Sequence, residues 1–222
     1  MMTRRVLVAA TAALALLVFG AGAFFYNRSL EQGAGSAAPA EESLLVRAHS
    51  PVIGPKDAPV TIVEFFDPAC EACRAFHPIV KQILAAYPDE VRVVLRYAAF
   101  HKGSDEAVRI LETARLQGAF EPVLEALLAA QPVWASHSAP DIAKAWEAAG
   151  AVGLDLTRAR RDMMMPDITA TLNQDTADVH AAGVKQTPTF FVNGKPLPSF
   201  GAQQLYDLVS AEVAAARRNA GG

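Results

Sequence analysis

Residues 60–73 read VTIVEFFDPACEAC, and this stretch decides the fold. Residues 60–66 are almost continuously apolar, which predicts a buried β-strand. Cys70 and Cys73 follow where the strand pattern gives way to a helix pattern, and they are the only cysteines in a chain of 222 residues. A C-x-x-C pair at a strand-to-helix turn is typical of a redox-active dithiol.

The spacing of the two cysteines suits thiol–disulfide exchange. Residues at i and i+3 share one helix face, so both sulfurs lie within disulfide reach. Cys70 would lie at the helix N-terminus, where unpaired N–H groups and the helix dipole favour a thiolate. We therefore expect Cys70 to be the nucleophile and Cys73 the resolving thiol. A purely structural disulfide is the weaker interpretation, because so short a loop constrains the unfolded chain little.

Composition and the N-terminal sequence indicate the class of protein and its compartment. Apolar residues make up 52% of the chain and the net charge is −3, which favours a packed domain and excludes a basic nucleic-acid-binding surface. Residues 6–26 carry no charge and follow two arginines, so residues 1–26 are predicted to be a signal anchor or a cleaved signal peptide, the anchor preferred for its length. Either alternative places the rest at the periplasmic face of the inner membrane or in the periplasm, where disulfides persist.

The rest of the chain alternates between strand and helix patterns. Residues 27–56, with many small and polar residues, are predicted to be a linker, and a folded domain is expected over 57–217. The expected strands are 60–66, 91–97, 189–192 and 195–197. The expected helices are 74–87, 105–117, 121–130, 140–149, 155–164, 167–181 and 203–217. This order predicts an α/β sandwich interrupted by a helical block over about 103–182.

Two motifs resemble the DsbA family of thioredoxin-fold thiol–disulfide oxidoreductases. They are DAPVTIVEFFDPACEAC (57–73) and GVKQTPTFFVNG (183–194), in the expected order. The likeness covers roughly 57–216, and the helical block matches that family's helical insertion. It implies cysteine-containing protein substrates and a redox partner, expected in the membrane, that reoxidises or reduces the dithiol. No cofactor is expected.

The resemblance also assigns roles outside the dithiol. Thr187-Pro188 matches the family's cis-proline loop, which would lie beside the sulfurs and hold an extended substrate strand. Glu64 matches a buried acidic residue beneath the dithiol, which would have a raised pKa and relay a proton to or from Cys73. The alternatives are an ordinary strand start for Thr187-Pro188 and a solvated edge position for Glu64.

The direction of electron flow stays open. Many strongly oxidising members carry a histidine between the cysteines, whereas this chain has Glu71-Ala72, a carboxylate that should oppose thiolate formation. We therefore expect the pKa of Cys70 to be lowered, but less than in the strongest oxidants. Thr187 resembles the isomerase and reductase branches, so an oxidase is favoured only slightly over those activities.

Two further functions, copper binding and a non-catalytic interaction role, are alternatives to thiol–disulfide exchange. Cys70, Cys73 and His77 lie near one helix face, which allows a copper-binding role, although no fourth ligand is evident. A non-catalytic thioredoxin-fold module would require the dithiol to be lost, and it is intact. Three consecutive methionines, Met163, Met164 and Met165, are expected to pack against the helical block. Trp134 and Trp146 are expected to anchor the core of that block. The histidines His101, His137 and His180 have no spacing relation to the dithiol in the sequence.

Overall fold

The computed structural model describes residues 44–221. The predicted signal segment and the first part of the linker, up to residue 43, lie outside the described residues. Within 44–221, none of the helices combines the length and the hydrophobicity needed to cross a bilayer.

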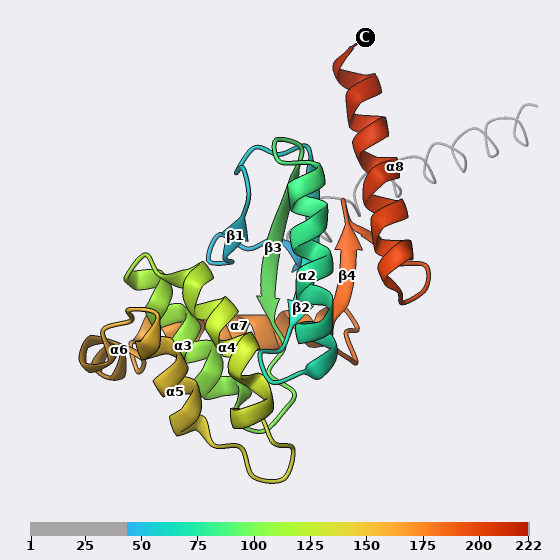
Figure 1. Ribbon diagram of the computed structural model, residues 1–222. Helices are drawn as coiled ribbons and strands as arrows, with labels where there is room; N and C mark the ends of the chain where they lie inside the picture. The colour runs from blue at the N-terminus through green and yellow to red at the C-terminus, as the bar shows by residue number, and fades with distance from the viewer. Residues whose placement is uncertain (1–43, 222) are drawn as a thin grey trace, which may run out of the picture. The chain divides into compact units, whose positions relative to one another are not determined.

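A five-stranded mixed sheet lies at the centre of the domain, with strand order β1-β3-β2-β4-β5 (Figure 1). The strands are β1 (Val52–Ile53), β2 (Val60–Phe66), β3 (Val91–Tyr97), β4 (Thr189–Val192) and β5 (Lys195–Pro196). β3 is parallel to β2, and β4 pairs with the other edge of β2 in the antiparallel direction. The strand that leads to the dithiol is therefore the central strand, as its continuous apolar sequence requires.

Seven helices surround this sheet within residues 44–221. They are α2 (Glu71–Ala86), α3 (Ser104–Leu116), α4 (Phe120–Trp134), α5 (Ile142–Ala151), α6 (Leu156–Asp162), α7 (Pro166–Ala181) and α8 (Ala202–Ala220). Each predicted helix is present. The helix after the dithiol begins at Glu71 rather than Arg74 and runs through Pro78 without interruption, so Cys70 is its N-cap.

The two faces of the sheet bury different residues. On one face, Ile62 and Phe66 join a core formed with α2, α8 and the helical block. Trp134 and Trp146, 0% and 2% exposed, are buried in that core as predicted. Of the three consecutive methionines, only Met163 packs against it, whereas Met164 is 67% and Met165 39% exposed, so the packing expected of those two is not observed.

The opposite face carries a smaller core, formed by Phe65 and Val94 of the sheet with Val179 of α7 and Leu45. Leu45 belongs to a segment, residues 44–56, that the sequence places in the linker. In the structure this segment instead packs on the domain, and its residues Val52 and Ile53 add β1 to the edge of β3. A strand of only two residues has too little sequence pattern to be predicted.

A buried ionic network fastens this segment to the sheet. The guanidinium of Arg96, fully buried on β3, donates to Asp175 at 2.8 Å and to Asp178 at 2.5 Å, both on α7. Arg47 donates to Asp178 at 2.7 Å, and the ring of His49 hydrogen-bonds to Asp175 at 2.7 Å. Burial by itself raises the pKa of Asp178. The hydrogen bonds from Arg47, Arg96 and Gln174 outweigh burial and lower this pKa to about 2. The network thus joins β3, α7 and residues 47–49.

We expect Asp175→Asn to lower the free energy of unfolding by about 3 kcal/mol, because it leaves the buried Arg96 charge incompletely paired. Urea unfolding of the full chain measures this. Asp207→Asn, at an exposed position of α8 where the carboxylate accepts from the neighbouring Gln203, is the matched control and should stay within about 0.5 kcal/mol of the parent. Equal stability of the two variants would contradict a structural role for the network.

Candidate active site

The two cysteines lie where the central strand meets helix α2. Cys70 has an extended backbone (φ −79°, ψ 121°) as the N-cap of α2, and Cys73 lies in its first turn. Both are free thiols, 6% and 0% exposed respectively. The Cys70 thiol donates to the carbonyl oxygen of Thr187 at 3.2 Å, and the backbone N–H of Asp67 points at the Cys73 sulfur at 3.5 Å.

The Thr187–Pro188 peptide bond is cis, as the family resemblance implies. It immediately precedes β4, which pairs with β2 from Phe65↔Thr189 onward. Because β2 leads into the dithiol turn, this pairing brings the loop beside Cys70. The structure therefore places Thr187 and Pro188 at the sulfurs, although they are more than 110 residues away in sequence.

The two thiols have opposite electrostatic environments. The pKa of Cys70 is lowered to about 5, mainly by a hydrogen bond from the Cys73 thiol. Burial opposes this lowering, while the backbone N–H groups of Cys73 and Ala72 add to it. The pKa of Cys73 is raised far above the ordinary value by burial, by its hydrogen bond to Cys70 and by the charge of Glu64. Cys70 is thus favoured as the thiolate and Cys73 as the thiol.

The sequence predicted that the Glu71 carboxylate opposes ionisation of the Cys70 thiol, but Glu71 is not among the main influences on the Cys70 pKa. Its carboxylate accepts a hydrogen bond from the ring of His137 at 2.7 Å, and its pKa is lowered by its own backbone N–H and by His137. The pKa of Cys70 is nevertheless only moderately depressed, in line with the expectation, because burial rather than Glu71 is the main opposing effect.

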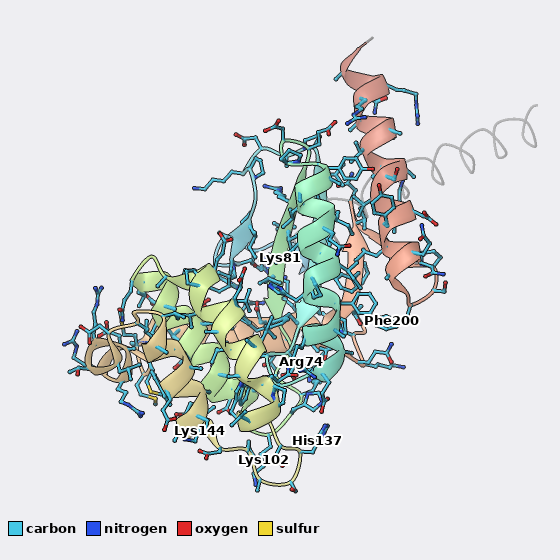
Figure 2. All side chains as sticks on the ribbon, viewed as in Figure 1. Arg74, Lys81, Lys102, His137, Lys144 and Phe200 are labelled. Carbon is cyan, nitrogen blue, oxygen red and sulfur yellow. The ribbon has the colours of Figure 1, made fainter. Side chains whose placement is uncertain are left out.

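Glu64 is buried, 4% exposed, so the solvated edge interpretation is wrong. Burial, and then the charge of Cys70, raise its pKa to about 8. The carboxyl group makes no hydrogen bond within residues 44–221, and it lines a cavity of about 330 Å³ together with His77 and Lys81 of α2. Lys81 is labelled in Figure 2. A carboxyl group that titrates near neutral pH beside a buried thiol is suited to proton transfer.

The buried carboxylate of Asp67 holds the dithiol turn, and sequence analysis did not single it out. Its Oδ1 accepts from the backbone N–H of Ala69 at 2.9 Å and from the Ser104 hydroxyl at 2.5 Å. Its Oδ2 accepts from the N–H groups of Phe100 and His101 at 2.8 and 3.0 Å. The sequence contains one sign of this role: Asp67 lies between a buried strand and the C-x-x-C motif. An acidic side chain at such a turn can accept hydrogen bonds from free backbone N–H groups.

The helical block contributes a second tie to the same turn. The side chain of Gln131, buried in α4, donates to the carbonyl oxygens of Pro68 and Cys70, each at 2.9 Å. A glutamine inside an apolar helix gives no local sign of this contact, so the sequence could not reveal it.

Two histidines expected to be unrelated to the dithiol lie beside it. The ring of His101 hydrogen-bonds to Asp67 at 2.7 Å, and the ring centroids of His101 and His137 are 5.6 Å apart. Burial lowers the pKa of His101, but Asp67 and the charges of Cys70 and Glu71 raise it more, so the net shift is upward. The expectation is wrong for these two histidines, whereas His180 is exposed on α7.

His77 does not join the cysteines in a ligand cluster. It lines the cavity under α2, and burial lowers its pKa. Within residues 44–221, no group of three or more His, Cys, Asp or Glu side chains is arranged to hold a metal ion. The copper-binding interpretation stays an untested alternative.

Comparisons with known proteins agree with this geometry. A family model described as thioredoxin matches residues 47–210. A thioredoxin-like oxidoreductase from Silicibacter pomeroyi DSS-3 has a similar structure, with a TM-score of 0.66 and 34% identity over 80% of this chain and 97% of that one. Wolbachia pipientis alpha-DsbA1, at 16% identity and a TM-score of 0.69, covers 81% of this chain and 98% of its own, which shows a shared fold.

The chain belongs to the thioredoxin family, and its resemblance to the DsbA-like thiol–disulfide oxidoreductases is confirmed. Curated relatives include the Na⁺/H⁺ antiporter NhaA of Herminiimonas arsenicoxydans, which is 32% identical over 166 residues, or 74% of this chain and 25% of that protein. The chain therefore spans about a quarter of the length of this relative.

We expect the thiolate absorbance of the reduced protein to rise with pH around a midpoint near 5, so that Cys70 is ionised at neutral pH. Cys73→Ala removes the main hydrogen-bond donor and should move the midpoint up by about one pH unit or more. Cys73→Ser, which keeps a donor of similar size, is the matched control and should shift it less. Identical midpoints in the two variants would show that the Cys73 hydrogen bond is not the cause.

Proposed function

We propose that the protein exchanges disulfides with cysteine-containing protein substrates through Cys70 and Cys73. The observation that carries this proposal is the electrostatic difference between the two sulfurs, because thiol–disulfide exchange needs one ready thiolate and one thiol held in reserve. The fold supports the class of reaction, and the free dithiol supplies the groups that react.

In the oxidising direction, a substrate thiolate attacks the Cys70 sulfur of the Cys70–Cys73 disulfide. The S–S bond breaks, a mixed disulfide forms between substrate and Cys70, and Cys73 leaves with the electron pair. The high pKa of Cys73 requires that it take up a proton, and the protonated Glu64 carboxyl group is the donor we propose. A second substrate thiolate then attacks the substrate sulfur, and Cys70 leaves as its stabilised thiolate.

Thr187 and Pro188 are proposed to position the substrate. The Thr187 carbonyl oxygen lies 3.2 Å from the Cys70 sulfur, so a substrate strand that pairs with this backbone would hold its own sulfur next to Cys70. This contact also explains why the loop belongs to the site rather than to an ordinary strand start.

Disulfide donation is the direction we favour. A lowered Cys70 pKa stabilises the reduced form, which makes the disulfide a better oxidant. A pKa of about 5 lies between those of a strong oxidant and thioredoxin, so isomerase or reductase activity is the alternative. We place the reaction outside the cytoplasm, at the periplasmic face of the inner membrane or in the periplasm, with a membrane-bound redox partner, on the strength of the N-terminal sequence.

We expect the oxidised full chain to transfer its disulfide to a reduced unfolded protein, with a reduction potential between about −270 and about −120 mV in a glutathione buffer. Cys70→Ser should abolish transfer, and Cys73→Ala, when mixed with a substrate that carries a disulfide, should attack it through Cys70 and accumulate the mixed disulfide because no second thiol releases it. A potential at the thioredoxin end of this range would favour the reductase alternative. Full transfer by Cys70→Ser would refute the proposed nucleophile.

In the reducing direction, Cys70 attacks a substrate disulfide and Cys73 then attacks the mixed disulfide to release the substrate. For this direction we expect Glu64→Gln to slow release roughly tenfold or more, while attack by Cys70 stays near the parent rate. In the parent, attack by Cys73 on the mixed disulfide should accelerate as pH rises through about 8, because ionised Glu64 is the base. Single-turnover kinetics resolve the two steps.

The matched control is Glu125→Gln, which alters a carboxylate at the rim of the same cavity where it pairs with Lys81. It should change neither step by more than about twofold, as expected for an exposed ion pair. If Glu64→Gln keeps the parent's pH profile, the carboxyl group does not relay the proton.

A further inference from the structure

A cavity of about 430 Å³ is lined by residues of α2, of α4 and of the loop after α4, and its lining includes Glu71, the residue that follows Cys70. It is lined by Glu71 and Arg74 from the start of α2, by Gln131 near the end of α4, and by residues 135–138 of the loop that follows. Figure 2 shows Arg74 on α2 next to α4, and His137 on that loop. The function proposed above uses none of these side chains.

The cavity is placed to receive a part of the substrate. The carbonyl oxygen of Cys70 accepts from both the side chain of Gln131 and the backbone N–H of Arg74. On the β4 side, the Cys70 sulfur contacts Thr187. Cys70 therefore lies between the proposed strand-binding loop and the cavity, so a polypeptide bonded to its sulfur has its neighbouring residues within reach of the cavity.

The polar groups of the cavity are only partly paired. Within residues 44–221 the Arg74 side chain has no hydrogen bond or ion pair, and its Nε is buried without a partner. Gln131, 1% exposed, has a buried Oε1 that is also unpartnered. Unpaired buried polar atoms are costly in a folded protein. The Arg74 Nε is a donor that a carboxylate can satisfy, whereas the Gln131 Oε1 is an acceptor and needs a donor from another part of the ligand.

The charges at the cavity favour an anion. Arg74 supplies a guanidinium, whose planar donors suit a carboxylate, and Ser136 and Ser138 add hydroxyl groups. Glu71 is the one carboxylate in the lining, and it hydrogen-bonds with His137 rather than with Arg74. The positive charge of Arg74 is thus left for a partner.

We propose that this cavity is a substrate subsite that binds the carboxylate of an acidic residue adjacent to the substrate's reactive cysteine. Aspartate and glutamate side chains are the anions that a polypeptide substrate carries next to its cysteine. The subsite rests on the proposed disulfide exchange and adds to it a preference for substrate sequence. Arg74 forms the ion pair, and the serine hydroxyls donate to the same carboxylate.

The test uses two thiol peptides that differ only in Glu or Gln beside the cysteine. Each reduces the oxidised full chain, and the ratio of the two second-order rate constants is measured. We expect the parent ratio to exceed that of Arg74→Gln roughly fivefold, the size of a partly exposed ion pair, and to shrink at high salt. Comparing ratios cancels the peptides' own reactivity and any change in the Cys70 thiolate.

The same ratio of rate constants is measured for three further variants of the chain. Arg74→Lys keeps the charge and should retain part of the preference. Arg74→Glu should reverse it, so that a peptide with Lys beside its cysteine reacts faster than the Glu peptide. Arg218→Gln removes an arginine near the far end of α8 and should keep the parent ratio.

An equal ratio in the parent and in Arg74→Gln overturns the subsite. If both peptides still reduce the parent but not Cys70→Ser, the proposed disulfide exchange stands without it. If neither peptide reacts with the parent, both proposals fail.

Discussion

The hydrogen bonds accepted by the buried Asp67 carboxylate fix the geometry on which the site depends. One side chain joins the dithiol turn to the end of β3 and to the first residue of α3. The backbone N–H of the same residue points at the Cys73 sulfur. A carboxylate that satisfies several N–H and O–H donors at once holds a turn more firmly than any single contact, because all donors must be released together.

This fixed turn makes two chemically identical side chains behave differently. Cys70 caps a helix, borders the cis-proline loop and receives a hydrogen bond, so its thiolate is stabilised. Cys73, one helical turn on, faces the interior and the Glu64 carboxyl group, so its thiol is preferred. Burial has the largest effect on the Cys73 pKa, whereas the hydrogen bond from Cys73 has the largest effect on the Cys70 pKa.

The sequence predicted the parts of the fold that depend on local pattern. The strand before the dithiol, each helix and the two strands on either side of Asn193-Gly194 are all present in the structure. Residues that act through distant contacts were missed. Gln131 looks like any polar residue in a helix, and His101 reaches the site only because β3 is parallel to β2. The burial of Arg96 likewise depends on two acids about eighty residues further along the chain.

The helical block interrupts the sheet domain in sequence, but the contacts of Gln131 and Ser104 with the redox turn argue for mutual dependence of block and sheet. The peptide groups of the redox turn are tied partly by the block and partly by the sheet. Excising the block would remove the Gln131 donor from the carbonyl oxygens of Pro68 and Cys70, and the Ser104 donor from the Asp67 carboxylate. Sequence variation in the block is therefore free on its outer surface and restricted where α3 and α4 meet the turn, so block and sheet must evolve together.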